Sequence, residues 1–170
     1  MKRLLLLDGK NYDDSMPEIN RVSVRGIAFL DGRLIFAEES SGFLKLPGGG
    51  QDEGETDLET LVREFKEETG CSVIPESVRE FGYIEEKRRS LHEDMIWHQF
   101  NHLYFCEVDG TQGDCDYSDN EKNRGMHPAL WTLEEALAKN LKVLEEEGKQ
   151  AWNQREYNTL LLIKEYLDKE

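Results

Sequence analysis

The stretch LPGGGQDEGETDLETLVREFKEETGC, residues 46–71, places three consecutive glycines ahead of a helical pattern that is rich in acid. Thr56 and Glu59 have the spacing of a capping box, in which the two side chains satisfy free backbone N–H groups at a helix start. Gly70 stands where a helix commonly ends in a left-handed residue. The spacing therefore predicts a helix from Asp57 to Thr69.

The predicted helix carries an apolar side and, next to it, an acidic wedge. At about 100° per residue, the side chains at positions 58, 61, 62 and 65 cluster, and Glu64, Glu67 and Glu68 share the neighbouring wedge. Like charges three or four residues apart destabilise a helix by about 0.2–0.5 kcal/mol per pair. The wedge therefore needs either open solvent or a bound cation, and oxygen ligands favour magnesium, manganese or calcium over zinc.

The composition of the whole chain limits its class. With 170 residues, 38% of them hydrophobic, we expect a single domain over residues 1–170. A formal net charge of −15 disfavours nucleic acid and anionic membranes as partners. The apolar run at residues 4–7 is too short for a signal peptide or a membrane span. The three cysteines lack the spacing of a disulfide framework or zinc knuckle. These features predict a cytoplasmic protein.

Hydrophobic period and turn residues predict strands on both sides of the helix. The expected strands are Arg3–Leu7, Val22–Leu30, Leu34–Glu38, Val78–Arg89 and Ile96–Val108. Asp31-Gly32 predicts a tight hairpin turn, and residues 90–94 join a second hairpin. Capping boxes that begin at Thr132 and Asn153 predict two closing helices. Strands with interleaved helices predict an α/β sheet that is covered on both faces.

Residues 49–71 resemble a complete Nudix box. The pattern consists of Gly49, then Glu55 after five intervening residues, then, after seven more, the run Arg63-Glu64-Phe65-Lys66-Glu67-Glu68-Thr69-Gly70-Cys71. Cys71 at the last apolar position is a mild departure that a small buried thiol can fill. The likeness extends to residues 46–48 ahead of the box and to Trp131–Leu137 after it. This resemblance to the Nudix hydrolase family implies an α/β/α sandwich with a mixed central β-sheet.

The resemblance implies a divalent-metal-dependent hydrolase that cleaves the diphosphate bond of a nucleoside diphosphate linked to another moiety. Mg²⁺ or Mn²⁺ would be the cofactor, cancelling the local negative field and lowering the pKa of an attacking water. By the same resemblance, the metal ligands would be Glu64, Glu67, Glu68 and the Gly49 carbonyl. Arg63, beside the acidic wedge, can hold a glutamate in place by a charge-assisted hydrogen bond. Glu55 would tie the loop to the helix, which Gly70 ends.

Basic and aromatic residues outside the box are weaker candidates. Four of them are candidates for contact with the substrate: Arg25, Lys45, Lys87 and Arg88. The basic cluster at residues 87–89 could equally be an exposed strand end, and the two residues near the glycine loop are equally undecided. Trp131 is expected in the core rather than as a platform for a base.

The polar stretch from Asp109 to Pro128 is long for a connection inside a domain, and such loops are often functional. The resemblance implies one further acid from the loop ahead of the strand that holds the tryptophan, as a metal ligand or as the catalytic base. We expect that strand to start near Trp131. Glu121 is the preferred residue because of its reach, although it could merely solvate the loop. The less favoured acids are Asp116, Asp119, Glu86 and Glu93.

Two other patterns imitate metal sites. His98, His102 and Cys106 recur every four residues, but in a strand that spacing separates neighbours by about 13 Å. The run from Asp114 to Asn120 begins like a calcium loop but has Asp119 in place of the required glycine. A polar turn is the favoured interpretation there.

The sequence leaves the substrate open between a nucleoside triphosphate and a nucleotide sugar. The proline that marks many ADP-ribose-cleaving relatives is missing, since Pro75 comes too early and Pro128 too late. Two alternatives to a pyrophosphohydrolase are a non-catalytic nucleotide- or effector-binding domain of the same fold and an isoprenoid-diphosphate isomerase. Assembly as a homodimer is also left open.

Overall fold

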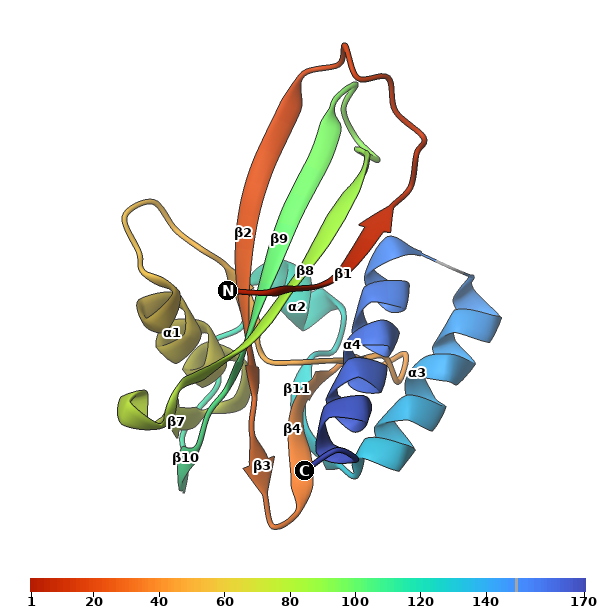
Figure 1. Cartoon of the computed structure of the whole chain (residues 1–170). Coiled ribbons are helices and arrows are strands. Elements are labelled where there is room, and N and C mark those ends of the chain that lie inside the picture. The colour runs from red at the N-terminus through yellow and green to blue at the C-terminus, as the bar shows by residue number, and fades with distance from the viewer. Residues whose placement is uncertain (149) are drawn as a thin grey trace.

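The computed structural model describes residues 1–148 and 150–170, and it contains both strands and helices (Figure 1). The strands in this part are β1 (Arg3–Asp8), β2 (Glu18–Ile27), β3 (Phe29–Leu30), β4 (Arg33–Glu38), β5 (Leu44–Lys45), β6 (Gly48–Gly50), β7 (Cys71–Val73), β8 (Arg79–Arg89), β9 (Ile96–Phe105), β10 (Val108–Gln112) and β11 (His127–Trp131). The helices are α1 (Asp57–Thr69), α2 (Asp119–Asn123), α3 (Leu133–Glu147) and α4 (Ala151–Leu167), with a 3₁₀ turn at Pro75–Ser77.

The central sheet has the order β1-β8-β9-β2-β6. It is mixed, because β1 runs parallel to β8 and β2 parallel to β9, whereas β8 pairs antiparallel with β9 and β2 with β6. A second sheet has the order β11-β4-β3, with β5 also paired to β4, and β7 pairs with β10. The predicted mixed central sheet is confirmed.

Helices cover both faces of the central sheet. On one face, apolar side chains of the sheet pack with those of α3 and α4, among them Ile27, Ile84, Leu103, Leu160 and Ile163. On the other face, Val24 packs with Leu61 and Phe65 of α1. Figure 1 shows α1 on one side of the strands and the α3–α4 pair on the other. The expected three-layer arrangement is therefore present.

The helix of the Nudix box forms as its capping residues predict. It runs from Asp57 to Thr69, and the Thr56 and Glu59 side chains make both hydrogen bonds of the capping box. Gly70 ends the helix with φ of 73°. The hairpin turn is also confirmed, with Asp31 and Gly32 at φ of 50° and 75°.

Several predicted boundaries are wrong. The second closing helix starts at Ala151, so Asn153 is a buried residue inside it rather than its cap. The expected strand from Val22 to Leu30 is divided at Ala28 into β2 and β3. The tryptophan strand ends at Trp131 instead of starting there. These differences arise because tertiary pairing, which the local pattern does not contain, sets element ends.

The connection before β11 is more ordered than a plain loop. It contains the short helix α2, whose N-cap Ser118 forms a capping box with Glu121. Ser118-Asp-Asn-Glu121 has the same spacing as the box at Thr56, so the sequence carries a local signal for a helix where only a polar loop was expected. Among the described residues, no helix has the length and apolarity needed to cross a membrane.

Candidate active site

The glycine loop lies against β2 at the edge of the central sheet, and two of its glycines are required by close contacts. A Cβ on Gly48, whose φ is 141°, would clash with the Val24 carbonyl oxygen. A Cβ on Gly49 would clash with the Glu64 carboxylate. Gly48 thus lets the strands pair, whereas Gly49 gives the first glutamate of the acidic wedge its place beside the backbone.

These contacts predict different outcomes for two neighbouring substitutions. Gly49→Ala should displace the Glu64 carboxylate and lower the hydrolytic turnover that the resemblance implies by about a hundredfold, with little change in melting temperature. Gly48→Ala should instead lower the free energy of unfolding by about 3 kcal/mol, because backbone must move. Thermal melting and initial rates on both variants check this pair. Wild-type turnover in Gly49→Ala would show that Glu64 does not need this position.

Arg63 connects the box helix to the loop. Its Nε lies 2.7 Å from Glu55 Oε1, its Nη1 lies 2.6 Å from Glu64 Oε1, and its Nη2 donates to the Gly50 carbonyl at 3.3 Å. The hydrogen bond from Arg63 lowers the pKa of Glu55 to about 2. Arg63 therefore holds the loop and Glu64 in one arrangement through charge-assisted hydrogen bonds.

Glu68 is the most buried carboxylate of the wedge, with 1% of its surface exposed. Its Oε2 accepts a hydrogen bond from the Gly48 N–H at 2.9 Å. Its Oε1 lies 2.7 Å from Lys45 Nζ, in an orientation that leaves it without a directed hydrogen bond. Burial raises the pKa of Glu68 even though the Lys45 ammonium opposes this shift. The protein thus holds a buried carboxylate beside the loop, with the Gly48 N–H on one oxygen and the Lys45 ammonium close to the other.

Glu64 and Glu67 complete the wedge. Burial raises the pKa of each, and the Arg63 guanidinium acts against that shift. Glu67 is the more exposed of the two, and its carboxylate lies 3.5 Å from Arg63 Nη1. The three carboxylates are therefore held by two basic side chains, Arg63 and Lys45.

The resemblance implies a bound divalent metal ion, and the arrangement of the residues shows whether they fit such an ion. Within residues 1–148 and 150–170, no three acidic, histidine or cysteine side chains are already gathered as a metal cluster. The donor set nevertheless fits a hard cation, because it consists of oxygens. Glu68 Oε1 is buried without a directed hydrogen bond, and Glu64 occupies the space that Gly49 leaves open. A divalent cation would compete with Arg63 and Lys45 for these oxygens.

The loop before β11 packs on the end of α1. The Asp116 N–H donates to the Glu67 carbonyl at 2.8 Å, and the Tyr117 hydroxyl donates to the Glu68 carbonyl at 2.7 Å. This docking brings the Glu121 carboxylate next to that of Glu68 and near Lys45. Burial acts to raise the pKa of Glu121, but hydrogen bonds from Ser118 and the nearby Lys45 outweigh it and lower the pKa. The predicted acid is thus placed at the carboxylate site.

The less favoured acids lie in different places. Asp116 is close enough to Glu67 to raise its pKa, so it also lies at this end of α1. Asp119 is exposed in the first turn of α2. Glu86 is buried in an ion pair with Arg155 at 2.7 Å, and Glu93 is exposed in the β8–β9 turn.

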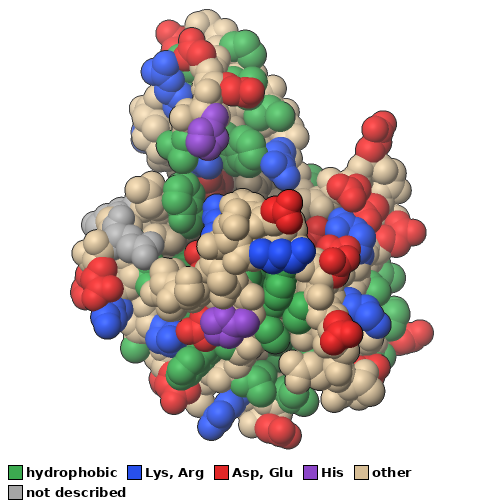
Figure 2. Space-filling model, turned by 180° about the vertical axis from the view of Figure 1, so that it is seen from behind, with side chains coloured by type: hydrophobic (Ala, Val, Ile, Leu, Met, Phe, Trp, Pro, Cys, Tyr) green, Lys and Arg blue, Asp and Glu red, His purple; other side chains and the backbone are tan. Residues whose placement is uncertain are grey.

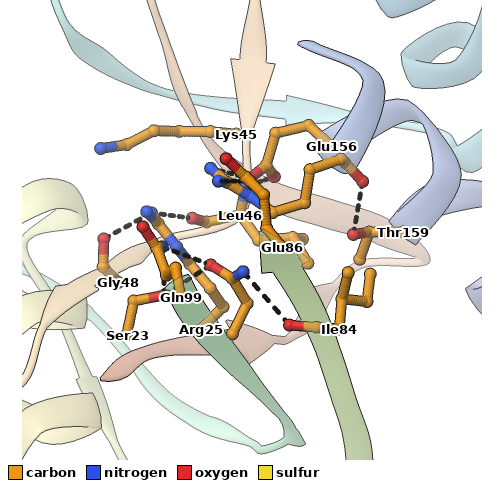
Figure 3. Close-up of polar contacts among 12 residues, drawn as sticks. Ser23, Arg25, Lys45, Leu46, Gly48, Ile84, Glu86, Gln99, Glu156 and Thr159 are labelled. Atoms are coloured by element: carbon orange, nitrogen blue, oxygen red, sulfur yellow. Dashed lines mark hydrogen bonds and ion pairs between the residues drawn. The ribbon is translucent and has the colours of Figure 1, made fainter. Parts of the chain in front are cut away.

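The four basic candidates divide into two groups. Arg25 is buried and its Nη1 donates to the carbonyls of Leu46 and Gly48, at 3.1 and 2.5 Å, as Figure 3 shows. Lys45 pairs with Glu68, so both residues lie at the glycine loop. Lys87 pairs with Glu18 at 3.0 Å and Arg88 with Glu86 at 2.8 Å. The structure therefore places the second pair at the far end of β8.

Lys87 and Arg88 line a cleft of about 440 Å³ between the end of β8 and the start of α4. Figure 2 shows a hollow between the projecting end of the sheet and the body of the molecule. Near it, Arg155 pairs with Glu86 and Glu156, and Glu156 accepts the Leu46 N–H at 3.2 Å. The sequence pattern predicted no role for Arg155 and placed Glu156 in a cap. The available signal in the sequence was the presence of charged residues among the apolar positions of α4, which indicates buried ion pairs.

Residues singled out for other chemistry have structural contacts. His102 Nδ1 and the Tyr104 hydroxyl both lie 2.6 Å from Asp57 Oδ2 at the start of α1. His98 lies between two glutamates of neighbouring strands. Trp131 packs against the core and donates its Nε1–H to Glu38 at 2.9 Å. The expectation that Trp131 belongs with the core agrees with these contacts.

A family model for the NUDIX domain matches residues 20–151. The chain belongs to the NUDIX domain family. It is a Nudix-type hydrolase, an enzyme of the class that acts on pyrophosphate bonds. No curated protein matches the sequence.

The fold is shared with solved structures of low sequence identity. A NUDIX hydrolase from Nitrosomonas europaea is 18% identical, covers 89% of this chain and 90% of its own, and superposes with a TM-score of 0.58. A MutT NUDIX hydrolase from Burkholderia pseudomallei is 19% identical over 68% of this chain and 85% of its own, with a TM-score of 0.53. An ADP-ribose pyrophosphatase from Streptococcus suis is 17% identical over 67% of this chain and 75% of its own, with a TM-score of 0.50.

Proposed function

We propose that this chain is a divalent-cation-dependent pyrophosphohydrolase whose substrate is a nucleoside diphosphate linked to another moiety. The observation that supports this best is the Glu68 carboxylate, which is buried beside the glycine loop with an oxygen that lacks a directed hydrogen bond. A chain with a net charge of −15 requires cations to accept a phosphate ester. Magnesium or manganese is the cofactor that the oxygen donors favour.

The side chains at the site have separate tasks in this proposal. Glu64, Glu67, Glu68 and the Gly49 carbonyl would hold the cation. A bound divalent cation offsets phosphate charge and makes water a better nucleophile at neutral pH. Arg63 keeps Glu64 beside the loop, and Arg25 keeps the loop carbonyls in position. These contacts preorganise the site before substrate arrives.

Glu121 is the proposed base. Its carboxylate adjoins Glu68, and its lowered pKa keeps it ionised at neutral pH. It would take the proton of the water that attacks phosphorus while the bond from phosphorus to the bridging oxygen breaks.

A nucleotide screen tests this function. The protein is incubated with nucleoside triphosphates and nucleotide sugars, and phosphate, pyrophosphate and nucleoside monophosphate are measured with and without magnesium. We expect magnesium-dependent cleavage of a diphosphate bond in at least one compound. Binding of nucleotides without cleavage would favour the non-catalytic alternative, and isomerised isoprenoid diphosphate would favour the isomerase.

Divalent metal should also stabilise the fold. A cation that relieves the repulsion within the acidic wedge binds the native state alone. At a cation concentration one hundred times Kd, this binding adds about 2.7 kcal/mol to the free energy of unfolding. For a chain of this size we expect melting to rise by about 5 °C or more in millimolar magnesium or manganese. Potassium chloride at the same ionic strength is the control. No rise in either metal would favour a simply solvated acidic helix.

A further inference from the structure

Arg21 on β2 is an exposed basic residue next to the glycine loop. Its guanidinium lies over Gly50, where a Cβ would come within 2.7 Å of Arg21 Nη2. The Gly50 carbonyl accepts a hydrogen bond from Arg63 at 3.3 Å. Gly50 therefore contacts both Arg63, which holds the carboxylates, and Arg21.

The position of Arg21 is fixed by an aromatic ring. Its Cζ lies 4.9 Å from the ring centroid of Trp97 on β9. Trp97 donates its Nε1–H to Gln99 at 3.0 Å, and Gln99 is buried and bonded to Asn101. A guanidinium held over an indole keeps its charge and loses less freedom when it binds a ligand.

The charge of Arg21 is not neutralised by a neighbour. Arg88 lies over the same indole, 5.6 Å from its centroid, but pairs with the buried Glu86 at 2.8 Å. In the part of the chain that the structure describes, Arg21 forms no ion pair with a carboxylate. In a protein that is 34% charged with acids in excess, an unpaired arginine over an aromatic ring has its positive charge available to an external anion.

We propose that Arg21, positioned by Trp97, binds a phosphoryl group that lies beyond the diphosphate held at the carboxylates. The preferred substrate is then a nucleoside triphosphate, and a nucleotide sugar with an uncharged distal group is a poorer one. This inference rests on the proposed function, because it takes the carboxylate site as the place of cleavage. The planar fork of arginine matches phosphate oxygens, and Gly50 leaves the room that the guanidinium occupies.

Steady-state kinetics on paired substrates test the inference. Arg21→Gln should raise KM for a nucleoside triphosphate by about tenfold, the usual size of one charge-assisted contact, with kcat within about twofold. KM for ADP-ribose or UDP-glucose should not change. Arg33→Gln, an exposed arginine at the β3–β4 turn, makes the same change in net charge and should match the wild type on both substrates.

Two further variants separate positioning from stability. Trp97→Phe keeps an aromatic face and should retain most of the affinity, whereas Trp97→Ala should raise KM for the triphosphate as Arg21→Gln does. Magnesium tripolyphosphate provides a probe without turnover of a nucleotide. It should shift the Trp97 indole N–H resonance, assigned by its loss in Trp97→Phe, in the wild type but not in Arg21→Gln.

The outcomes distinguish the two proposals. Cleavage of nucleotide sugars alone, or equal effects of Arg21→Gln on both substrates, would overturn the role of Arg21 and leave the pyrophosphohydrolase intact. Equal kinetics of Arg21→Gln and Arg33→Gln on the triphosphate would do the same. Absence of magnesium-dependent cleavage of any nucleotide in the wild type would overturn both.

Discussion

We expect Glu68→Gln to lower magnesium-dependent turnover by about a thousandfold or more and to leave the fold intact. The substitution keeps the size of the side chain but removes the charge from the one wedge carboxylate that is fully buried beside the glycine loop. Glu68 is a proposed ligand of the catalytic cation, and removing such a ligand affects the transition state more than substrate binding, so kcat should fall more than KM changes. Initial rates on the substrate found by the nucleotide screen measure the effect.

Thermal melting separates this effect from unfolding. Burial raises the pKa of Glu68, which means that the metal-free protein tolerates the ionised form poorly. Without metal, the melting temperature of the glutamine variant should therefore lie within about 5 °C of that of the wild type. Magnesium should raise the melting temperature of the variant much less than that of the wild type. Glu145→Gln, at an exposed position of α3, is the matched control and should behave as the wild type. Full turnover in Glu68→Gln would remove the proposed site from α1.

Glu121→Gln should lower turnover by about a hundredfold to a thousandfold and alter the pH-rate profile. A base works when it is ionised, so activity falls as pH drops through its pKa. Although burial opposes the shift, the hydrogen bonds from Ser118 and the nearby Lys45 lower this pKa below the ordinary value of 4.5. The wild-type acidic limb attributable to Glu121 therefore lies below that value, and the variant should lose it.

The capping role of Glu121 supplies a second reason to test it carefully. Its Oε2 accepts hydrogen bonds from the Ser118 N–H and hydroxyl, both at 2.9 Å, so the substitution also weakens the cap of α2. Asp119→Asn removes an acid from the same turn without touching these bonds and serves as the control. An unchanged rate and acidic limb in Glu121→Gln would redirect the search for the base to Asp116, which lies near Glu67.

Local pattern was sufficient for the helix of the box and for the hairpin turn. Thr56, Glu59 and Gly70 make the capping contacts that their spacing predicts, because each bond is formed within a few residues. Asn153 shows the limit of the same rule. It has an acceptable capping spacing, but the helix starts earlier, at Ala151, and Asn153 is buried inside it.

The candidate site also contains some features that the local sequence predicts and others that depend on the tertiary structure. The family, the acidic wedge and the pairing of Arg63 with box carboxylates followed from sequence alone, because these groups lie within one helix and the loop before it. Among distant residues, the sequence favoured Glu121 through the resemblance and left Lys45 undecided, and the folded arrangement of the chain decides their positions. That arrangement brings Lys45 and Glu121 to Glu68, and it places Arg21 over Gly50 and Trp97. Those contacts require strand register and loop docking, which bring together residues far apart in the chain and leave no periodic trace in the sequence.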